Sequence, residues 1–473
     1  MNILFASSEC YPFIKVGGLA DVVGALPKYL HHYRHDARVI LPKYQNIPDV
    51  YVEKMVKIMD GTVLIDWRKQ KMGVYELKYN GVIYYFVDNE FYFGTRDRIY
   101  DYADEAERFA FFQKAILEFL KKSDFKVDII HANDWHTGML PHLVKSIYRE
   151  DFPNTKVVYT IHNIAYQGIF PLDCFKMFNV EMDSIFEFEG MLNFLKAGIA
   201  EADLVTTVSE TYAKEILDDY YGFGMQRLLK LRENDLKGII NGVDYKVYNP
   251  ETDKMIAFNY NFDNFNEGKL KNKEALYKKL GIDFYLDSPL ISVVSRLVNQ
   301  KGFDLLMPVI DEILTEFNVK LVVLGAGEEK YEKFFKTLEA KYPWKVKTYI
   351  GYSEELAHLV YAASDLFLMP SKFEPCGIGQ LIALRYGTLP IVRETGGLKD
   401  SVIPYNEYEL KGNGFSFTNY NAHDMMYVIK YALRIYRFKI HWNELVKEAM
   451  SSDYSWLSSA KKYSDLYRKL MKK

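Results

Sequence analysis

Cysteine is scarce in this chain: only three occur among 473 residues, and no two form a CxxC pair. Disulfide frameworks and structural zinc sites both need clustered cysteines, so neither is expected, and no metal site is predicted. Isolated thiols favour a reducing compartment, which predicts a cytoplasmic protein. The three residues are Cys10, Cys174 and Cys376.

Long hydrophobic runs and an excess of one charge are also missing. No apolar run approaches the ~20 residues that span a bilayer, so no membrane association is expected. The first residues, MNILFASSE, lack the basic start and long apolar stretch of a signal peptide and fit a first strand instead. The 60 basic and 63 acidic residues are well mixed, with a net charge of −3, so no basic face indicates a nucleic-acid partner.

The chain does contain short apolar runs that alternate with amphipathic stretches. This alternation predicts an α/β protein whose parallel sheets are covered by helices on both faces. Doubly wound sheets of this kind bind ligands at the carboxyl ends of their strands. The expected strands cover residues 2–7, 37–42, 82–87, 127–131, 156–161, 203–208, 237–240, 289–295, 319–325, 346–350, 365–369 and 389–392.

The length of the chain predicts two domains, since one compact core seldom grows this large. The stretch 251–275 interrupts the alternation, because it is rich in Asn, Lys, Asp and Phe and follows an Asn-Pro pair. We therefore expect a first domain at 1–245 and a second at 246–453. Residues 454–473 carry apolar side chains at helical spacing and are expected to form a helix that packs back on the first domain.

Three motifs in the first half follow expected strands. In KVGGLADV, Lys15 and two glycines precede a helix, where free amides and a nearby cation form an anion-binding nest. This spacing fits neither GxGxxG nor a P-loop. HANDWH, residues 131–136, would suit a sugar, with indole for stacking and Asp134 for hydroxyls, and His162 follows the next strand. The alternatives are a glycine turn, a capping acid beside a buried Trp, and a structural histidine.

In the second half, SRLVNQKG places two cations after a strand. Arg296 and Lys301 lie five residues apart and could clamp one pyrophosphate, although solvated surface charge is the alternative. Tyr352, in a later turn at a strand end, could stack on a base. In SKFEPCGIGQL, residues 371–381, the carboxylate Glu374 precedes glycines that open a helix.

One acid beside several free amides suits a neutral polyol next to an anionic group, which describes a sugar attached to a phosphate. Glu374 and neighbouring amides would hold the sugar hydroxyls, while Gly396 and Gly397 would form a second nest after the last strand. A cysteine nucleophile is the alternative, but no His or Asp motif adjoins it, so a small thiol in a tight turn is favoured. The amides belong to Cys376, Gly377 and Ile378.

Together, these motifs resemble those of the bacterial glycogen synthase and plant starch synthase family. KVGGLADV, HANDWH, IHN, SRLVNQKG, PSKFEPCGIGQ and TGGLKDS occur in the family's order and approximate spacing, as do INGVD, GYSE and the late YSW. The likeness covers essentially the whole chain. It implies the GT-B architecture, in which two Rossmann-like doubly wound domains face a cleft that holds the active site.

The resemblance also implies an activity: transfer of glucose, with retention, from a nucleotide sugar to the non-reducing 4-OH of an α-1,4-glucan such as glycogen. ADP-glucose is the usual donor in bacteria, and no metal or other cofactor is required. Carried over by motif, the catalytic residues are Lys15, Asp134, His162, Arg296, Lys301 and Glu374. The donor-binding residues are Gly18, Asp21, Asn241, Tyr352, Cys376, Gly377, Ile378, Gly396 and Gly397.

Several alternatives stay open at this point. A stacking Tyr352 accepts any base, so UDP-glucose is possible as donor. Val16, Asn133 and Lys372 stand where the family commonly has Thr, His and Arg, which bears on acceptor fit. Other functions are a GT-B transferase for sucrose or lipid acceptors, which generally lacks KxGGLADV, and a non-catalytic glucan-binding scaffold. A glycogen phosphorylase would need a lysine-anchored pyridoxal phosphate site, which we do not find.

The sequence also bears on the mechanism. No pair of carboxylates stands out as nucleophile and acid, unlike in a retaining glycosidase. We therefore favour attack on the same face as the leaving group, with the leaving phosphate deprotonating the acceptor hydroxyl, over two inversions through a covalent intermediate.

Overall fold

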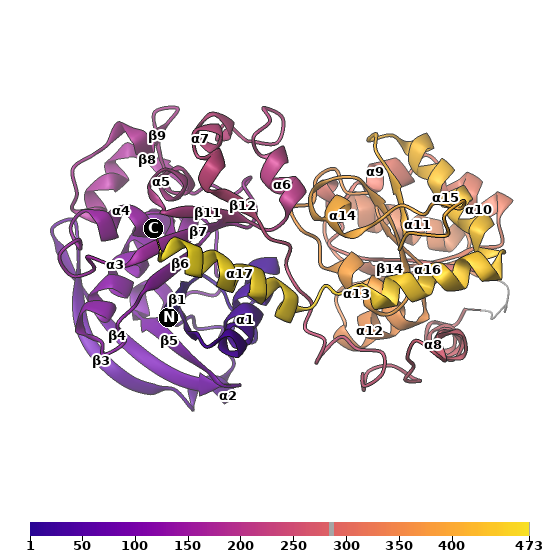
Figure 1. Cartoon of the computed structure of the whole chain (residues 1–473), viewed down its shortest axis with the longest axis horizontal. Helices are drawn as coiled ribbons and strands as arrows, with labels where there is room; N and C mark the ends of the chain where they lie inside the picture. The colour runs from indigo at the N-terminus through magenta and orange to yellow at the C-terminus, as the bar shows by residue number, and fades with distance from the viewer. Residues whose placement is uncertain (283–287, 473) are drawn as a thin grey trace. The chain divides into compact units, whose positions relative to one another are not determined.

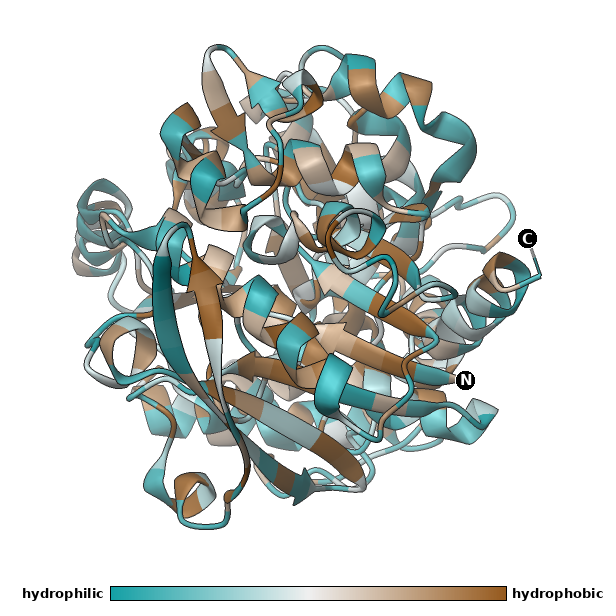
Figure 2. Ribbon diagram, turned by 90° about the vertical axis from the view of Figure 1, so that its left-hand side faces the viewer, coloured by the Kyte–Doolittle hydropathy of each residue, from teal (hydrophilic) through white to brown (hydrophobic). Residues whose placement is uncertain are grey.

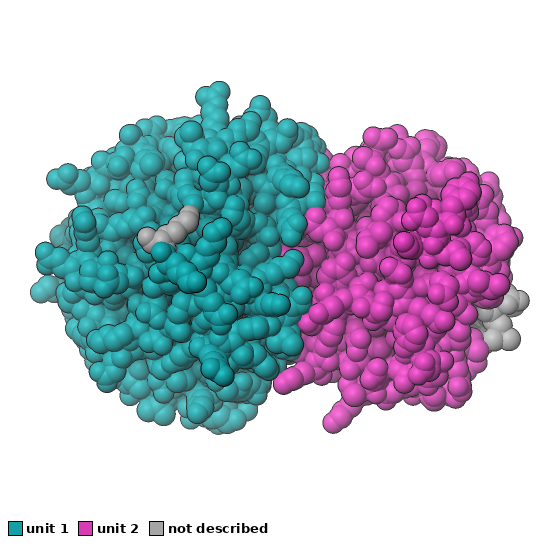
Figure 3. All heavy atoms as spheres, viewed as in Figure 1, with its two compact units in different colours: residues 1–239, 456–473 teal, residues 240–455 magenta. Residues whose placement is uncertain are grey.

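The computed structural model describes residues 1–282 and 288–472, which form two compact units (Figure 1). Unit 1 contains residues 1–239 and 456–473, and unit 2 contains residues 240–455 (Figure 3). The divisions thus fall at 239/240 and 455/456 rather than at 245/246 and 453/454. None of the described helices is long and apolar enough to cross a bilayer.

A nine-stranded sheet forms the centre of unit 1, in the order β12-β11-β7-β6-β1-β2-β5-β4-β3. The first seven strands in this order are parallel, and β4 and β3 extend the sheet as an antiparallel hairpin. Figure 2 shows hydrophobic residues gathered on these strands. The strands are β1 (Asn2–Ala6), β2 (Asp36–Pro42), β3 (Val56–Ile65), β4 (Arg68–Tyr79), β5 (Val82–Asp88), β6 (Ile129–Asn133), β7 (Lys156–Ile161), β11 (Leu204–Thr207) and β12 (Leu236–Gly238).

The helices of unit 1 connect these strands, and the C-terminal helix joins them. α17 was expected from the spacing of apolar residues, and it packs beside α1 (Figure 1). The helices are α1 (Gly18–Leu30), α2 (Asp49–Val52), α3 (Glu105–Lys122), α4 (Leu140–Lys145), α5 (Phe194–Glu201), α6 (Glu210–Glu215), α7 (Gln226–Leu231) and α17 (Trp456–Leu470).

Shorter elements complete unit 1. A small antiparallel sheet has the order β8-β10-β9, and η2 is a π-helical turn, whereas the other η elements are 3₁₀ turns. They are β8 (Ile169–Pro171), β9 (Glu187–Phe188), β10 (Met191–Asn193), η1 (His31–Tyr33), η2 (Glu90–Gly94), η3 (Trp135–Thr137), η4 (Leu172–Phe178), η5 (Ser184–Phe186) and η6 (Glu233–Asp235).

Unit 2 is built on a six-stranded sheet in the order β15-β14-β13-β16-β17-β18, with every neighbouring pair parallel. The strands are β13 (Leu290–Val294), β14 (Lys320–Gly325), β15 (Val346–Ile350), β16 (Leu366–Met369), β17 (Leu389–Arg393) and β18 (Phe415–Phe417). The helices are α8 (Phe265–Leu280), η7 (Asn299–Lys301), α9 (Phe303–Leu306), α10 (Ile310–Glu316), α11 (Glu329–Lys341), α12 (Glu354–Ala363), α13 (Gly379–Arg385), α14 (Gly396–Ser401), α15 (Ala422–Tyr436) and α16 (Lys439–Ser451).

Each sheet has a point where the strand order reverses, and this point predicts where ligands bind. In unit 1 the order reverses between β1 and β6, so the loops that follow these two strands diverge there. In unit 2 it reverses between β13 and β16. The motifs at 7–18 and 131–136 therefore lie at the switch point of unit 1, and those at 295–302 and 370–378 at the switch point of unit 2.

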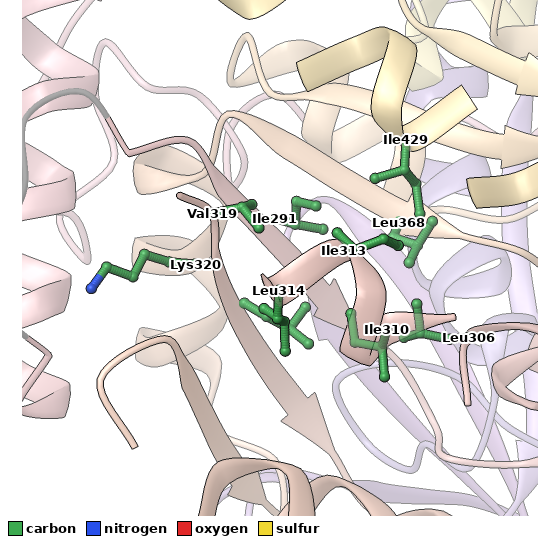
Figure 4. A pocket seen from close by; sticks show the side chains of 10 residues that line it. Ile291, Leu306, Ile310, Ile313, Leu314, Val319, Lys320, Leu368 and Ile429 are labelled. Carbon is green, nitrogen blue, oxygen red and sulfur yellow. The ribbon is translucent and has the colours of Figure 1, made fainter. Parts of the chain in front are cut away.

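The core of unit 2 contains a small apolar cavity between its sheet and α10 (Figure 4). Its volume is about 10 Å³, and aliphatic side chains such as Ile291, Ile310 and Leu368 line it. One water molecule would fill such a space, and apolar walls give it no hydrogen-bond partner. The cavity is therefore a packing defect and no candidate binding site.

Candidate active site

Asp134 is a buried acid with an uncommon main-chain conformation. It follows β6 with φ 53° and ψ −178°, a conformation that non-glycine residues seldom adopt. Its carboxylate Oδ1 accepts the His162 main-chain N–H at 2.8 Å, and only 8% of the residue is exposed. Burial raises the pKa of Asp134 to about 7; the charge of Glu9 adds to this, and main-chain N–H groups of His162 and Asn163 oppose it. A strained, buried acid that titrates near neutrality is typical of a functional site.

His162 follows β7, and its ring is held by Asn133. The distance from His162 Nε2 to Asn133 Oδ1 is 2.9 Å, while Asn133 Nδ2 donates to the carbonyls of Ala6 and His131. Because the Asn133 amide is oriented by these carbonyls, His162 Nε2 must carry the hydrogen and Nδ1 is left as an acceptor. Burial lowers the pKa of His162 to about 3, so the ring is neutral. His162 can therefore accept a hydroxyl hydrogen but cannot serve as an acid at neutral pH.

The glycine nest before α1 differs from the expected open anion site. Glu9 Oε2 accepts the N–H groups of Val16 at 2.5 Å and of Gly17 at 3.0 Å, so an internal carboxylate already binds two of its amides. Gly18 begins α1, where N–H groups have no acceptor within the helix, and no atom of the described part of the chain lies within 4 Å of where its Cβ would stand. Lys15 Nζ pairs with Asp21 at 2.7 Å. In this nest, the Gly18 N–H and the Lys15 ammonium are therefore the candidates for binding an anion, whereas the Val16 and Gly17 amides are already bound to Glu9.

The Trp in HANDWH is not the sugar platform that the sequence indicated. Trp135 is buried, with its ring centroid 3.9 Å from that of His136 and 5.0 Å from that of Phe109. His131 is buried too; its Nδ1 lies 2.6 Å from the Tyr467 hydroxyl of α17. Of this motif, Asp134 remains the candidate for contact with substrate, and the aromatic residues support the fold.

Lys301 and Glu374 join the two loops that diverge at the switch point of unit 2. Lys301 Nζ lies 2.5 Å from Glu374 Oε2, which also accepts the Ser371 hydroxyl at 3.0 Å, and both side chains are largely buried. The glycine after Lys301 is required by this approach, because Gly302 has φ 74° and a Cβ there would stand 1.9 Å from the Pro370 oxygen. The loops after β13 and β16 are thus built around one ion pair.

Arg296 and Tyr352 lie at strand ends of unit 2 with exposed side chains. Arg296 follows β13, as predicted, but it is exposed, whereas Lys301 is largely buried. Tyr352 precedes α12, whose first turn is capped by the Ser353 hydroxyl, and 69% of it is exposed. Both side chains are open to a ligand, and the pyrophosphate clamp stays a prediction.

The loop 374–378 and the two glycines before α14 pack closely against each other. The Gly397 N–H points at the carbonyls of Glu374 and Pro375, at 3.2 Å each. A Cβ on Gly396 would stand 1.9 Å from the Glu374 oxygen, and one on Gly397 would stand 2.1 Å from the Cys376 oxygen. The expected second nest is therefore wrong in part: the Gly397 amide is already used, and both glycines permit close approach of main chains.

Cys376 is a buried thiol rather than a nucleophile. Burial raises its pKa to about 12, against a main-chain hydrogen bond from Asn241 that lowers it. Gly377 has φ 72°, and Ile378 is the residue before α13. The buried Asn241 Oδ1 has no hydrogen-bond partner within 1–282 and 288–472. An orphan acceptor beside this loop fits a site that a polar ligand completes.

Sequence reasoning missed four supporting residues, namely Glu9, Tyr100, Asn133 and Ser371. The Tyr100 hydroxyl donates to Glu9 Oε1 at 3.1 Å, and its ring stacks on His136. One signal was available, because Glu9 is an acid at the end of the first expected strand. The pairing of Tyr100 with Glu9 could not be predicted, since the two residues lie 91 positions apart in the sequence.

Comparisons with known proteins agree with this architecture. Residues 2–231 match the family model of the starch synthase catalytic domain, and residues 278–448 match that of glycosyl transferases group 1. A glycogen synthase of Geobacillus thermodenitrificans is 49% identical over 100% of this chain and 98% of its own length; one of Lachnospira eligens is 50% identical over 99% and 100%. The chain belongs to the bacterial glycogen synthase and plant starch synthase family.

Solved structures place this family member among the GT-B glycosyltransferases. The catalytic domain of starch synthase IV from Arabidopsis thaliana, bound to ADP and acarbose, has a TM-score of 0.92 and 32% identity, covering 100% of this chain and 99% of that one. A sucrose-phosphate synthase from Thermosynechococcus elongatus has a TM-score of 0.64 at 17% identity, covering 100% and 99%, and shows the fold alone. The expected GT-B fold with two Rossmann-like domains is confirmed, and the chain is a glucosyltransferase of this family.

Proposed function

We propose that this chain transfers glucose from ADP-glucose to the non-reducing 4-OH of an α-1,4-glucan, with retention of configuration. The curated relatives named glycogen synthase support the reaction, and the starch synthase structure that holds ADP and acarbose supports an adenine nucleotide and a glucan-like ligand. The three cysteines are free, which fits the proposed cytoplasmic location.

The Lys301–Glu374 pair is the observation that carries the proposal. Breaking a glycosyl–phosphate bond leaves negative charge on the diphosphate and positive character on the sugar. The Lys301 ammonium and the Glu374 carboxylate lie 2.5 Å apart at the switch point, where ligands bind in such folds. The ammonium can stabilise the negative diphosphate, and the carboxylate can stabilise the positive character of the sugar. We assign Lys301 with Arg296 to the diphosphate, and Glu374 with the amides of 376–378 to the donor glucose.

Unit 1 would supply groups for hydroxyls and phosphate. His162 Nδ1 would accept a sugar hydroxyl, and Asp134 would accept or donate one, depending on its protonation near neutral pH. Gly18 N–H and Lys15 would meet a phosphate oxygen. In unit 2, Tyr352 would stack on the base and Asn241 Oδ1 would accept a hydroxyl, which would give that buried atom the partner it needs.

Same-face attack is the mechanism that we propose. As the leaving diphosphate gains charge, Lys301 and Arg296 stabilise it, and one such preorganised contact is worth about 3–4 kcal/mol. The diphosphate oxygen then takes the proton of the acceptor 4-OH, which attacks from the same side and forms an α-linkage. In this scheme Asp134 and His162 orient hydroxyls and form no covalent bond to glucose.

The test is transfer of labelled glucose to maltooligosaccharides, with ADP-glucose and UDP-glucose compared at equal concentration. We expect faster transfer from ADP-glucose and products that β-amylase degrades, since this enzyme cleaves α-1,4 linkages from the non-reducing end. Faster transfer from UDP-glucose would overturn the donor assignment. Products that resist digestion would overturn retention, and binding of glucan without transfer would favour a scaffold.

A further inference from the structure

Glu9 is a buried carboxylate at the switch point of unit 1, and the proposed mechanism gives it no role. It follows β1, and only 4% of it is exposed. Its main chain is fixed by Ser7, whose hydroxyl donates to the Glu9 carbonyl at 2.7 Å and accepts its N–H at 3.3 Å. The carboxylate therefore enters the nest from a rigid strand end.

Within the described residues, three donors hold this carboxylate. Oε2 accepts the N–H groups of Val16 and Gly17, and Oε1 accepts the Tyr100 hydroxyl. Burial raises the pKa of Tyr100, so its hydroxyl stays protonated and donates. Amides that converge on a carboxylate form charge-assisted hydrogen bonds, which are stronger than neutral ones. Glu9 thus fixes the position of the loop that leads into α1.

The negative charge of Glu9 beside a phosphate-binding loop would repel the ligand, so the carboxylate must contribute something that offsets this repulsion. The geometry of the loop indicates what it contributes. With the Val16 and Gly17 amides bound inward, the next group along the chain is Gly18, the first residue of α1. Lys15, on the other side of this loop, is tied to Asp21 in the first turn of the same helix. By holding Val16 and Gly17, Glu9 therefore positions the residues on either side of them, Lys15 and Gly18.

We propose that Glu9 is a positioning residue for the donor phosphate: its carboxylate binds the Val16 and Gly17 amides so that the Gly18 N–H and Lys15 meet the diphosphate. The inference rests on the proposed function, since it takes the nest as part of the donor site. It predicts that hydrogen-bond geometry matters at Glu9 more than charge.

Three substitutions separate geometry from charge. Glu9→Gln removes the charge but keeps the pattern, because its Oε1 can accept both amides and its Nε2 can donate to the Tyr100 oxygen. Glu9→Asp keeps the charge but is one methylene shorter, so it cannot reach all three donors, and Glu9→Ala removes both. Glu107→Ala is the matched control, since Glu107 is a largely buried glutamate of unit 1 that binds Arg68 and Tyr92.

The measurements are ADP affinity by calorimetry, and KM for ADP-glucose and for glucan, with circular dichroism to check folding. We expect Glu9→Asp and Glu9→Ala to weaken ADP binding and raise the donor KM at least tenfold. Glu9→Gln should stay within threefold of wild type, and the glucan KM should change less than twofold throughout. Glu107→Ala should leave ADP affinity unchanged.

Three results would overturn the inference: wild-type ADP affinity in Glu9→Asp, equal impairment of Glu9→Gln and Glu9→Asp, or weakened ADP binding in Glu107→Ala. If Glu9→Ala does not fold, the Asp and Gln variants decide. A wild-type enzyme that transfers no glucose would refute the proposed function instead, and ADP affinity would still test the role of Glu9.

Discussion

Asp134 combines backbone strain with a costly buried charge, and both should appear in stability measurements. The pKa of Asp134 is about 7, against about 3.9 in an unfolded chain, so the folded protein binds more protons between these values. Stability from this group is therefore fully present below pH 4 and is lost as pH rises through 7. Asp134→Asn keeps an acceptor for the His162 N–H and removes this dependence.

We expect the stability that Asp134→Asn gains over wild type to be larger at pH 8 than at pH 5, by roughly 2–3 kcal/mol. Urea unfolding at both pH values measures it. Asp134→Gly relieves the strain at φ 53° but removes the carboxylate that accepts the His162 N–H, so its gain at pH 8 should be smaller than that of Asp134→Asn. Both variants should lose at least 100-fold in glucose transfer. A pH-independent difference would contradict the buried-acid interpretation.

The Lys301–Glu374 pair permits a test that separates folding from catalysis. Lys301→Met leaves a buried carboxylate that keeps, among the described residues, the Ser371 hydroxyl as a side-chain donor, which should cost about 3–5 kcal/mol. The double variant Lys301→Met/Glu374→Gln removes both charges and should regain most of that stability. Transfer should stay at least 1000-fold below wild type in both.

Thermal unfolding and single-turnover rates would measure the two effects of these variants. Lys341→Ala serves as control, because that exposed lysine pairs with Asp311 on the surface of the same unit and should change neither quantity. Recovery of transfer in the double variant would show that the pair acts through the fold alone.

At the scale of elements, the contact between the 374–378 loop and the start of α14 depends on glycine. We expect Gly396→Ala to displace this loop, because the added Cβ would stand 1.9 Å from the Glu374 oxygen. ADP-glucose affinity should fall at least tenfold and stability by several kcal/mol. Gly281→Ala is the control: its φ is 66°, but no atom of residues 1–282 and 288–472 lies within 4 Å of its Cβ position, so it should lose about 1 kcal/mol and no affinity.

Helices and strands could be predicted where their signal lies in consecutive residues of the sequence. Every expected strand is present with its ends displaced by at most two residues, because buried parallel strands are continuous apolar runs. The short strands β8, β9, β10 and β18 were missed, each only two or three residues long. β3 and β4 were missed too, since charged residues such as Lys57 and Lys69 interrupt the apolar pattern of this edge hairpin. The site motifs were found by resemblance and strand-end position, whereas partners such as Glu9 for the nest depend on folded geometry.

At the scale of the whole molecule, the chain enters unit 1 twice, with α17 returning after unit 2. The Tyr467 hydroxyl of α17 contacts His131 in the middle of β6, so the last helix is anchored to the central strands by a buried hydrogen bond. Tyr260 is a matching buried tyrosine in unit 2, and its hydroxyl donates to the Tyr386 carbonyl at 2.7 Å. Substitutions of Tyr467 and Tyr260 therefore probe the stability of unit 1 and of unit 2, respectively.

We expect calorimetry of the full chain to show two unfolding transitions, each sensitive to one of these tyrosines. Replacing a buried aromatic by Ala costs about 3–5 kcal/mol, which lowers the midpoint of a unit of this size by roughly 10 °C. Tyr467→Ala should lower one transition and Tyr260→Ala the other, because the cores that each side chain packs in are separate. A single transition that both substitutions shift equally would mean that the two units unfold together.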